Sequence, residues 1–283
     1  MTTANGKRQT ASSLFRIITF GCKVNQVDTA GLSQALAHQG WLTAPPGATP
    51  DLHLVNTCTV TKRADQQARQ AIRRLSREFP SVPIWVTGCY AQRAPEELAA
   101  LPGVTVVLGN REKADLADFL EKSTQATAPG LCVSSYQAAE PFHPWRLRSF
   151  PGHTRAWLKI QEGCSHHCSY CIVPQVRGPR RSWAPAEVVA ALQGITAANH
   201  QEVVLTGIDL GQYGQDLSPT TSLAGLVRRL KQAELPFRMR LSSLEPQEVT
   251  VELLAELASW RAFCPHFHLP LQSGAAPVLA AMN

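Results

Sequence analysis

The sequence predicts an α/β protein made of an N-terminal doubly wound parallel sheet followed by a partial (β/α) barrel that is truncated at its C-terminus. Short apolar runs alternate with longer amphipathic segments along most of the chain, which is typical of strands followed by helices. The chain has 283 residues, enough for about two domains of ordinary size. Three of the apolar runs end at or next to a cysteine, and ligands bind beyond the carboxyl ends of strands in such sheets.

The composition excludes several classes of protein. Hydrophobic residues make up 44% of the chain and charged residues 17%, which excludes disordered and fibrous proteins. No apolar stretch approaches the roughly 18 residues of a membrane-spanning helix, and residues 1–13 lack the apolar core of a secretory signal. We therefore expect a cytoplasmic protein with a frayed N-terminus and no membrane association. In that compartment eight cysteines favour metal binding or catalysis over disulfides.

The N-terminal domain is predicted to span residues 14–122. Its expected strands cover residues 14–20, 52–57, 84–87 and 104–108. Helices are expected between them at residues 27–39, at residues 62–79 and near Pro95. Pro80 should end the second helix, because a proline in a helix interior clashes and lacks the backbone N–H. This order of elements is that of a doubly wound sheet.

The first three of these strands lead directly into cysteines. Cys22 and Cys89 each follow a glycine at a strand end, and Cys58 follows the second strand without an insertion. A single cysteine at such a place is more often a small buried apolar residue. Three of them on successive parallel strands converge at one edge of the sheet, and this N-terminal cysteine trio (Cys22, Cys58 and Cys89) favours a shared metal site.

Residues 123–151 are predicted as a linker, because they are rich in Ala, Ser, Thr and Pro and show no sustained period. Residues 152–283 resume the alternation, with strands expected at 156–160, 203–207, 238–242 and 266–271 and helices at 185–193, 223–233, 248–260 and from Pro277. Only four strands are visible, so we expect an incomplete barrel. Cys132, in a possible edge strand within the linker, and Cys264 are expected to be structural.

A cysteine-rich loop follows the first strand of this second unit. Cys164, Cys168 and Cys171, the loop cysteine trio, have the spacing C-x3-C-x2-C at the face where barrels carry their active sites. Three thiolates can hold three irons of a four-iron cluster and leave the fourth iron open to a ligand. The alternative is a zinc site, for which His166 or His167 would supply a fourth ligand. We expect both histidines to be ordinary loop residues.

The loop, with Tyr170 before its last cysteine, resembles the signature of radical S-adenosylmethionine enzymes. The resemblance implies a [4Fe-4S] cluster on the loop cysteine trio, S-adenosylmethionine bound at the open iron, and reductive cleavage of that cofactor to a 5′-deoxyadenosyl radical. It also implies that Tyr170 lies near the adenine of the cofactor, although packing of the loop is the alternative role. Weaker candidates for cofactor contact stand at strand ends, where turn formation is the commoner role of such residues: Gly207, Ser242 and Gln272.

Most of the chain resembles the methylthiotransferases within that superfamily. The segments that carry this resemblance are Gly21–Gln26, Asn56–Thr61, Thr87–Gln92, Arg177–Ser182 and His268–Gly274. The resemblance implies that the N-terminal cysteine trio binds a second, auxiliary [4Fe-4S] cluster that carries the sulfur to be inserted. It further implies an electron donor such as flavodoxin or ferredoxin.

The triplet Lys23-Val24-Asn25 is similar to the bacterial branch that acts on N6-threonylcarbamoyladenosine at position 37 of tRNA. The product of that branch is the 2-methylthio derivative, and tRNA is then the partner. The alternatives are methylthiolation of isopentenyladenosine in tRNA or of a ribosomal protein. A further alternative is an inactive cluster-binding fragment, since the family continues through more barrel strands and a small RNA-binding domain that do not follow Asn283.

Two groups of basic residues are compatible with an RNA partner, which the net charge of +6 also favours. The helix at residues 62–79 has an expected apolar face of Ala64, Ala68, Ile72, Leu75 and Phe79. Opposite that face it carries the four arginines Arg69, Arg73, Arg74 and Arg77, although a solvated face is the commoner reason for such a pattern. The second group surrounds the loop cysteine trio, is opposed chiefly by Glu162, and is hypothesised to contact phosphates: Arg146, Arg148, Arg155, Lys159, Arg177, Arg180 and Arg181.

Overall fold

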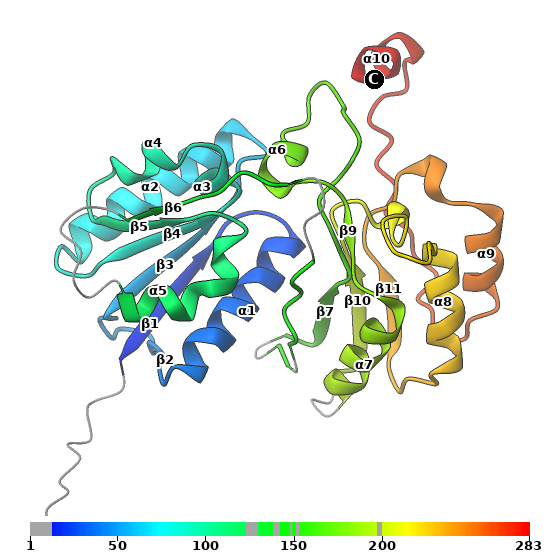
Figure 1. The fold of residues 1–283 in the computed structure, drawn as a ribbon, viewed down its shortest axis with the longest axis horizontal. Coiled ribbons are helices and arrows are strands. Elements are labelled where there is room, and N and C mark those ends of the chain that lie inside the picture. Colours follow the sequence, from blue (N-terminus) through cyan, green and yellow to red (C-terminus); the bar gives the residue numbers. More distant parts are fainter. Residues whose placement is uncertain (1–12, 123–129, 138–141, 148, 151–152, 197–199) are drawn as a thin grey trace, which may run out of the picture.

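The computed structural model describes residues 13–122, 130–137, 142–147, 149–150, 153–196 and 200–283 (Figure 1). Two parallel sheets flanked by helices dominate it, which confirms the predicted α/β class. The N-terminus that we expected to be frayed, Arg148 and much of the predicted linker lie outside the described residues. The domain boundaries remain a prediction.

The first sheet has six parallel strands in the order β2-β1-β3-β4-β5-β6. The order places the N-terminal strand inside the sheet and lets the chain wind outward from it in both directions. Figure 1 shows helices on both faces of this sheet. The strands are β1 (Leu14–Thr19), β2 (Leu42–Thr43), β3 (Leu52–Thr57), β4 (Ile84–Gly88), β5 (Val104–Leu108) and β6 (Gly130–Cys132).

Consecutive strand residues in this sheet enter different cores. Leu54 and Trp85 pack with α1 (Lys23–His38) and α5 (Leu116–Lys122) on one face, and their neighbours Val55 and Val86 pack on the other. Side chains alternate along a strand, so in a sheet covered by helices on both faces the residues of a central strand are buried on both sides. The second face is covered by α2 (Lys62–Glu78), α3 (Cys89–Arg93) and α4 (Pro95–Ala99).

The expected strands of this domain agree with the structure to within one residue, and α2 ends one residue before Phe79. Four features differ. Helix α1 begins at Lys23 instead of Val27, α3 starts directly at Cys89, and neither β2 nor α5 was predicted. Strand β2 has two residues, too few for periodicity to reveal. Strand β6, from the predicted linker, is the edge strand that was expected around Cys132.

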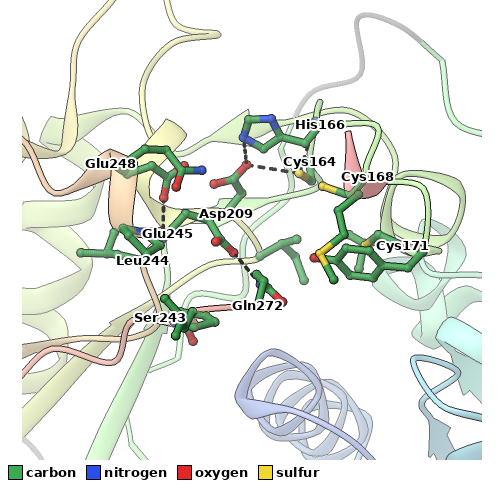
Figure 2. Close-up of a pocket in the computed structure, with 18 of the residues that line it drawn as sticks. Cys164, His166, Cys168, Cys171, Asp209, Ser243, Leu244, Glu245, Glu248 and Gln272 are labelled. Carbon is green, nitrogen blue, oxygen red and sulfur yellow. Dashed lines mark hydrogen bonds and ion pairs between the residues drawn. The ribbon is translucent and has the colours of Figure 1, made fainter. Parts of the chain in front are cut away.

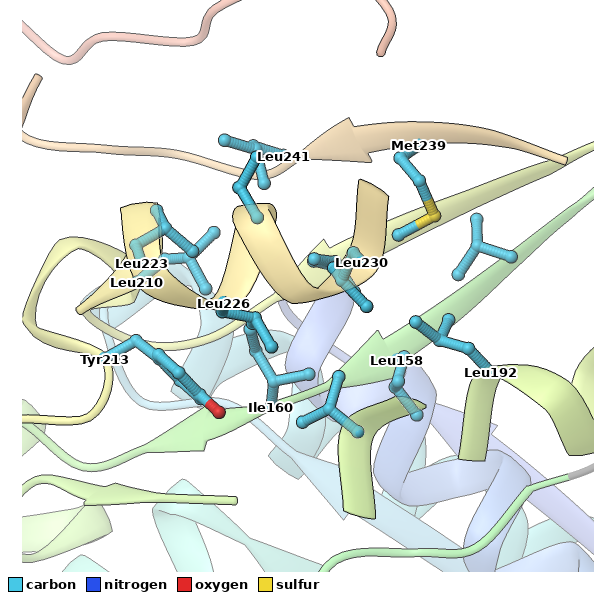
Figure 3. Close-up of a cluster of buried hydrophobic side chains, with 14 of the residues drawn as sticks. Leu158, Ile160, Leu192, Leu210, Tyr213, Leu223, Leu226, Leu230, Met239 and Leu241 are labelled. Carbon is cyan, nitrogen blue, oxygen red and sulfur yellow. The ribbon is translucent and has the colours of Figure 1, made fainter. Parts of the chain in front are cut away.

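The second sheet is parallel and has the order β11-β10-β7. Its core is filled by leucines and other apolar residues from these strands and the helices that cover them, including Leu158, Leu226 and Met239 (Figure 3). The elements are β7 (Arg155–Lys159), α6 (Val173–Arg177), α7 (Pro185–Thr196), β10 (Glu202–Thr206), α8 (Leu223–Gln232), β11 (Arg238–Leu241), α9 (Val251–Ala258) and α10 (Ala276–Met282), with the short antiparallel pair β8 (Gln161–Glu162) and β9 (Arg181–Ser182).

The fourth strand expected at residues 266–271 does not form. This segment makes only an isolated parallel bridge between Ser243 and His268. Pro265 precedes it and Pro270 lies within it; both lack the backbone N–H that a ladder needs, which the apolar pattern alone did not take into account. The four predicted helices of this unit, in contrast, are present as α7, α8, α9 and α10.

Helix α1 joins the two units. It packs against β7 as well as β1, and its Val27 belongs to the core of the second unit. The ring of Trp145 lies on Gly31, where a Cβ atom would come within 2.0 Å of the indole. The units therefore share an apolar interface next to the residues described below. None of the described helices is both long and apolar enough to cross a membrane.

Candidate metal and cofactor sites

The N-terminal cysteine trio lies at the carboxyl ends of three neighbouring strands. Cys22 precedes α1 after β1, Cys58 follows β3, and Cys89 begins α3 after β4. Because β1, β3 and β4 are adjacent and parallel, their ends lie at the same edge of the sheet. Cys58 and Cys89 are buried, whereas Cys22 is exposed. The structure thus brings together the three cysteines that the sequence pattern grouped.

Two glycines make this approach possible. Gly21 and Gly88 both have positive φ, at 106° and 99°, where side chains are disfavoured. A Cβ atom on Gly21 would lie 2.7 Å from Cβ and 3.0 Å from Sγ of Cys58, and one on Gly88 would lie 2.3 Å from the carbonyl oxygen of Thr57. The glycine before each cysteine therefore lets neighbouring strand ends come close together, which explains the two Gly-Cys pairs in the sequence.

The surroundings of this trio are polar. Burial raises the pKa of Cys58, and the nearby thiols of Cys89 and Cys22 raise it further by repulsion between thiolates. The side chain of Asn110 lies 3.9 Å from Sγ of Cys89, and Nε of Arg177 donates to the same sulfur at 3.2 Å. A cation that binds all three thiols, or a cation-rich cluster, would relieve this repulsion.

A network of buried charges, which the sequence did not reveal, lies directly beside this trio. We call Asp28, Lys113, Lys159, Glu162 and Arg177 the buried charge network; the side chains of all five are less than 10% exposed. Asp28 accepts hydrogen bonds from Lys113 at 2.5 Å, from Lys159 at 2.7 Å and from Arg177 at 2.9 Å. Glu162 accepts from Lys159 at 2.8 Å and from Arg177 at 2.5 Å. The network therefore connects α1 and the segment after β5 with β7, β8 and α6.

The charges of this network hold one another in the ionised state. Burial by itself would raise the pKa of Asp28, but Lys113, Lys159 and Arg177 hold it well below its usual value. For Glu162 burial is likewise outweighed by Lys159 and Arg177, and its pKa falls to about 2. Burial lowers the pKa of Lys113 to about 8 against the opposing effect of Asp28. A signal existed in the sequence: Asp28 occupies the same helical stripe as Val24 and Leu32, where an apolar residue is expected.

The loop cysteine trio lines a cleft of about 450 Å³ at the carboxyl ends of β7, β10 and β11 (Figure 2). Cys164, Cys168 and Cys171 lie on one side of the cleft, and Ser243 and Leu244 lie on the other. All three cysteines are partly buried and free of disulfides. Burial raises the pKa of Cys164 to about 12, and its Sγ–H donates to Oδ2 of Asp209 at 3.2 Å.

Three further polar side chains gather in this cleft. Nε2 of His166 lies 3.4 Å from Oδ2 of Asp209, and His166 also contacts Gln212. Burial, together with Asp209, raises the pKa of Glu248 to about 8. One ligand atom from each of His166, Asp209 and Glu248 lies within 4.8 Å of the others. His166 is therefore paired with the carboxylate of Asp209 beside the cysteines. The proximity of Asp209 and Glu248 was not predicted, because these two residues are 39 positions apart in the chain.

The four predicted cofactor contacts fall into two groups. Tyr170, 57% exposed, and Gln272 both line the cleft, where Gln272 donates to Glu245 at 3.3 Å. Gly207 and Ser242 are not among its lining residues; Gly207 packs against Gln161, and the hydroxyl of Ser242 is buried. Their neighbours Ile208 and Ser243 line the cleft instead. Around the end of β11 this follows from alternation, because consecutive side chains of an extended segment point to opposite sides.

The phosphate-contact hypothesis for the basic residues around the loop is wrong for two of them. Lys159 and Arg177 are only 3% and 1% exposed and belong to the buried charge network. Burial could not be foreseen from composition, because the partner Asp28 lies more than 130 residues away in the sequence. Others have partners within the chain: Arg146 pairs with Glu187, Arg155 with Glu202, and the guanidinium of Arg181 lies 4.8 Å from the ring centre of Tyr136.

Helix α2 has the amphipathic form that was predicted. Ala68, Ile72 and Leu75 are buried against the sheet, and Ala64 and Phe79 are partly buried. On the opposite side Arg73, Arg74 and Arg77 are exposed, whereas Arg69 is half-buried and donates to the hydroxyl of Tyr90 at 2.6 Å. The exposed arginines form a basic face on a helix that begins four residues after Cys58.

Both trios fit the chemistry of iron–sulfur ligation. Each offers three free thiols at strand ends, and the lining of the cleft at the loop cysteine trio contains no further cysteine. Three thiolates leave one iron of a four-iron cluster without a protein ligand. The loop trio faces a cleft of the size that holds a small cofactor, since ligand pockets commonly have volumes of about 300–1,000 Å³.

Comparison with known proteins matches a different family model to each of the two units. The model of uncharacterized protein family UPF0004 matches residues 14–109, and that of the radical SAM superfamily matches residues 158–283. The threonylcarbamoyladenosine tRNA methylthiotransferase MtaB of Bacillus subtilis is 37% identical over 94% of this chain and 59% of its own length; that of Aquifex aeolicus is 36% identical over 94% and 64%. A tRNA-2-methylthio-N(6)-dimethylallyladenosine synthase of Carboxydothermus hydrogenoformans is 31% identical over 96% and 63%.

A solved structure of similar fold is the radical S-adenosylmethionine methyltransferase TsrM from Kitasatospora setae. The TM-score is 0.65 at 16% identity, and the match covers 95% of this chain and 61% of that protein. The likeness therefore concerns the fold. The chain spans about 60% of the length of the curated relatives that it matches.

Proposed function

Because the chain belongs to the methylthiotransferase family of radical S-adenosylmethionine proteins, we propose that it takes part in attaching a methylthio group to carbon 2 of N6-threonylcarbamoyladenosine at position 37 of tRNA. The single observation that carries the proposal is the pair of cysteine trios, each at the carboxyl ends of parallel strands and each with three free thiols. One trio would indicate a single iron–sulfur site. Two separate trios indicate two such sites in one chain.

In this proposal the loop cysteine trio holds one [4Fe-4S] cluster and the N-terminal cysteine trio holds a second. When bound, the clusters supply an electron for cleaving S-adenosylmethionine and an iron position for the sulfur that is inserted. The chain's own residues hold the thiolates at two strand ends and shield them. Around the N-terminal trio, burial of Cys58 and Cys89 excludes water. An external electron donor such as flavodoxin or ferredoxin completes the system.

The cleft beside the loop cysteine trio is the proposed binding site for S-adenosylmethionine. Tyr170 offers an aromatic face to the adenine, and Gln272 and Glu245 offer an amide and a carboxylate to polar groups. Backbone groups at the end of β11, next to Ser242, and at the end of β10, next to Gly207, lie near the same edge. We assign the sheet β7-β10-β11 to a (β/α) barrel of residues 152–283 that follows the N-terminal domain of residues 14–122 and the linker of residues 123–151.

One observation supports threonylcarbamoyladenosine as the nucleoside, and another supports tRNA as the partner. Relatives named for that nucleoside are 32–37% identical to the chain, whereas those named for dimethylallyladenosine are 30–31% identical. The exposed arginines of α2 offer positive charge to a phosphate backbone. A tRNA substrate places the protein in the cytoplasm.

The test is an anaerobic reaction of the reconstituted chain with S-adenosylmethionine, a sulfide source and a reductant. Two tRNA pools are compared, one bearing threonylcarbamoyladenosine and one bearing isopentenyladenosine, and the nucleosides are analysed by mass spectrometry. We expect the methylthio mark on the first pool only. A mark on the second pool alone would contradict the assignment of substrate. Absence of both the mark and 5′-deoxyadenosine, with both clusters present, would contradict the proposed activity of this chain.

A further inference from the structure

Arg177 belongs to the second unit, yet it contacts a cysteine of the first. It is the last residue of α6, the helix that begins two residues after Cys171. Its side chain is 1% exposed, and its Nε donates to Sγ of Cys89 at 3.2 Å. The segment that carries the loop cysteine trio therefore also supplies a hydrogen-bond donor to the N-terminal cysteine trio.

The other nitrogens of the Arg177 guanidinium are fixed as well. Nη1 donates to Asp28 at 2.9 Å and to Glu162 at 2.5 Å, and Nη2 donates to the side-chain oxygen of Asn25. Asn25 in turn donates to the carbonyl oxygens of Phe20 and Thr57, the residues just before the Gly21-Cys22 pair and Cys58. Arg177 thus contacts Cys89 directly and braces the loops of the other two cysteines through Asn25.

The charges in this region do not balance within the protein. In the buried charge network three cations, Lys113, Lys159 and Arg177, face two carboxylates, Asp28 and Glu162, which leaves one positive charge in excess. Buried charges are costly unless an opposite charge accompanies them. The member of the network that touches a sulfur is the Arg177 guanidinium, so the excess charge lies beside the thiols. A set of thiolates on a metal cluster is an anion at that position.

We propose that Arg177 is a positioning residue that completes the N-terminal cysteine site from the other unit and stabilises negative charge on Cys89 when that site holds a cluster. This inference rests on the proposed function, in which the N-terminal cysteine trio binds an auxiliary [4Fe-4S] cluster. Hydrogen bonds to ligating sulfurs and nearby positive charge favour the reduced state of a cluster and orient its ligands. Removing Arg177 should therefore lower the reduction potential and weaken iron binding at this site alone.

The experiment isolates the N-terminal site in the full chain by the substitutions Cys164→Ala, Cys168→Ala and Cys171→Ala. Into this parent we introduce Glu162→Gln with Arg177→Met, a pair that removes one positive and one negative charge together. The matched control is Glu162→Gln with Lys159→Met. It removes the same two charges from the same network, since Lys159 also contacts Asp28 and Glu162, but leaves the Arg177 donor to Cys89 in place.

Iron per chain, the midpoint potential from an electron paramagnetic resonance titration and the thermal unfolding midpoint are measured for all three proteins. We expect the Arg177 variant to lose at least half of the iron that the control retains and to have a more negative potential, at a similar unfolding midpoint. Should it fail to fold, Arg177→Lys keeps the charge but not the Nε donor, and we expect it to have a more negative potential than the parent.

The outcomes separate this inference from the proposed function. A parent that takes up no iron after reconstitution contradicts the auxiliary cluster, and with it the premise of both. A parent that binds about four irons while the Arg177 variant and the control match in iron content and potential overturns the role of Arg177 and leaves the proposed function intact. If Arg177→Lys has the same midpoint potential as the parent, the proposed role of Arg177 is likewise overturned.

Discussion

Replacing Asp28 by asparagine tests the buried charge network most severely. The carboxylate is fully buried and accepts hydrogen bonds from Lys113 at 2.5 Å, Lys159 at 2.7 Å and Arg177 at 2.9 Å. The substitution keeps the shape but leaves three cations facing Glu162 alone. Breaking a buried pair by removing one partner typically costs about 3–5 kcal/mol, so we expect the free energy of unfolding to fall by about that amount.

Urea unfolding followed by circular dichroism measures this change, with Glu187→Gln as the control. Glu187 pairs with Arg146 on the surface at 2.8 Å, and both side chains are about half exposed. Exposed pairs contribute roughly 0–1 kcal/mol. If Asp28→Asn costs no more than the control, the buried charge network does not carry the charge that the structure assigns to it.

The same variant has a defined pH dependence. The folded protein holds the pKa of Asp28 well below its usual value, so its contribution is fully present above the unfolded pKa of about 3.9 and is lost as the pH falls through the folded pKa. The difference in unfolding free energy between the native protein and Asp28→Asn should therefore shrink below about pH 4. A difference that stays constant down to pH 2 would show that Asp28 is not held ionised in this way.

Three further predictions concern the core, the cleft and the basic face. Leu226→Ala opens a cavity among buried side chains (Figure 3) and should cost about 2–5 kcal/mol in urea unfolding, whereas Leu254→Ala, at a 42% exposed position, should cost much less. Because the pKa of Glu248 is raised to about 8, its ionisation costs stability as the pH rises from 4.5 to 8. We compare the thermal unfolding midpoints of Glu248→Gln and the native protein, both without clusters. The midpoint of the variant minus that of the native protein should rise between pH 4.5 and pH 8. A constant difference would contradict the raised pKa of Glu248. The exposed arginines of α2 are Arg73, Arg74 and Arg77. Replacing them by glutamine should reduce the slope of log K for tRNA binding against log salt concentration by about 0.7–0.9 for each phosphate that they neutralise. An unchanged slope would exclude this face as a tRNA contact.

The sequence predicted what local periodicity determines. Strands such as Leu52–Thr57 are buried at every position because both faces of the sheet are covered, and the cysteines after them necessarily meet at one edge. Two of the four candidate cofactor contacts, Tyr170 and Gln272, line the cleft: Tyr170 because it belongs to the cysteine loop, and Gln272 although the strand expected before it does not form. The fourth strand of the second unit was predicted wrongly, since an apolar run preceded by Pro265 and interrupted by Pro270 satisfied the pattern but not the hydrogen bonding.

The features that escaped prediction depend on interactions between distant parts of the chain. Arg177 and Asp28 are 149 residues apart, and nothing near either residue indicates the other. The same holds for Asp209 and Glu248, which meet only because loops at the ends of neighbouring strands converge. An isolated charge within an apolar stripe, as at Asp28 in α1, is the one local sign of such a network. Such a charge predicts burial but not the identity of its partners.

The measurement that tests the central claim most directly is the iron, sulfide and zinc content of the chain after anaerobic reconstitution. Two sites with three cysteines each predict about eight irons per chain, with matching sulfide. The variants Cys58→Ala and Cys168→Ala should each retain about four irons. Stoichiometric zinc with little iron, or an iron content that either substitution leaves unchanged, would contradict the assignment of an iron–sulfur cluster to each trio.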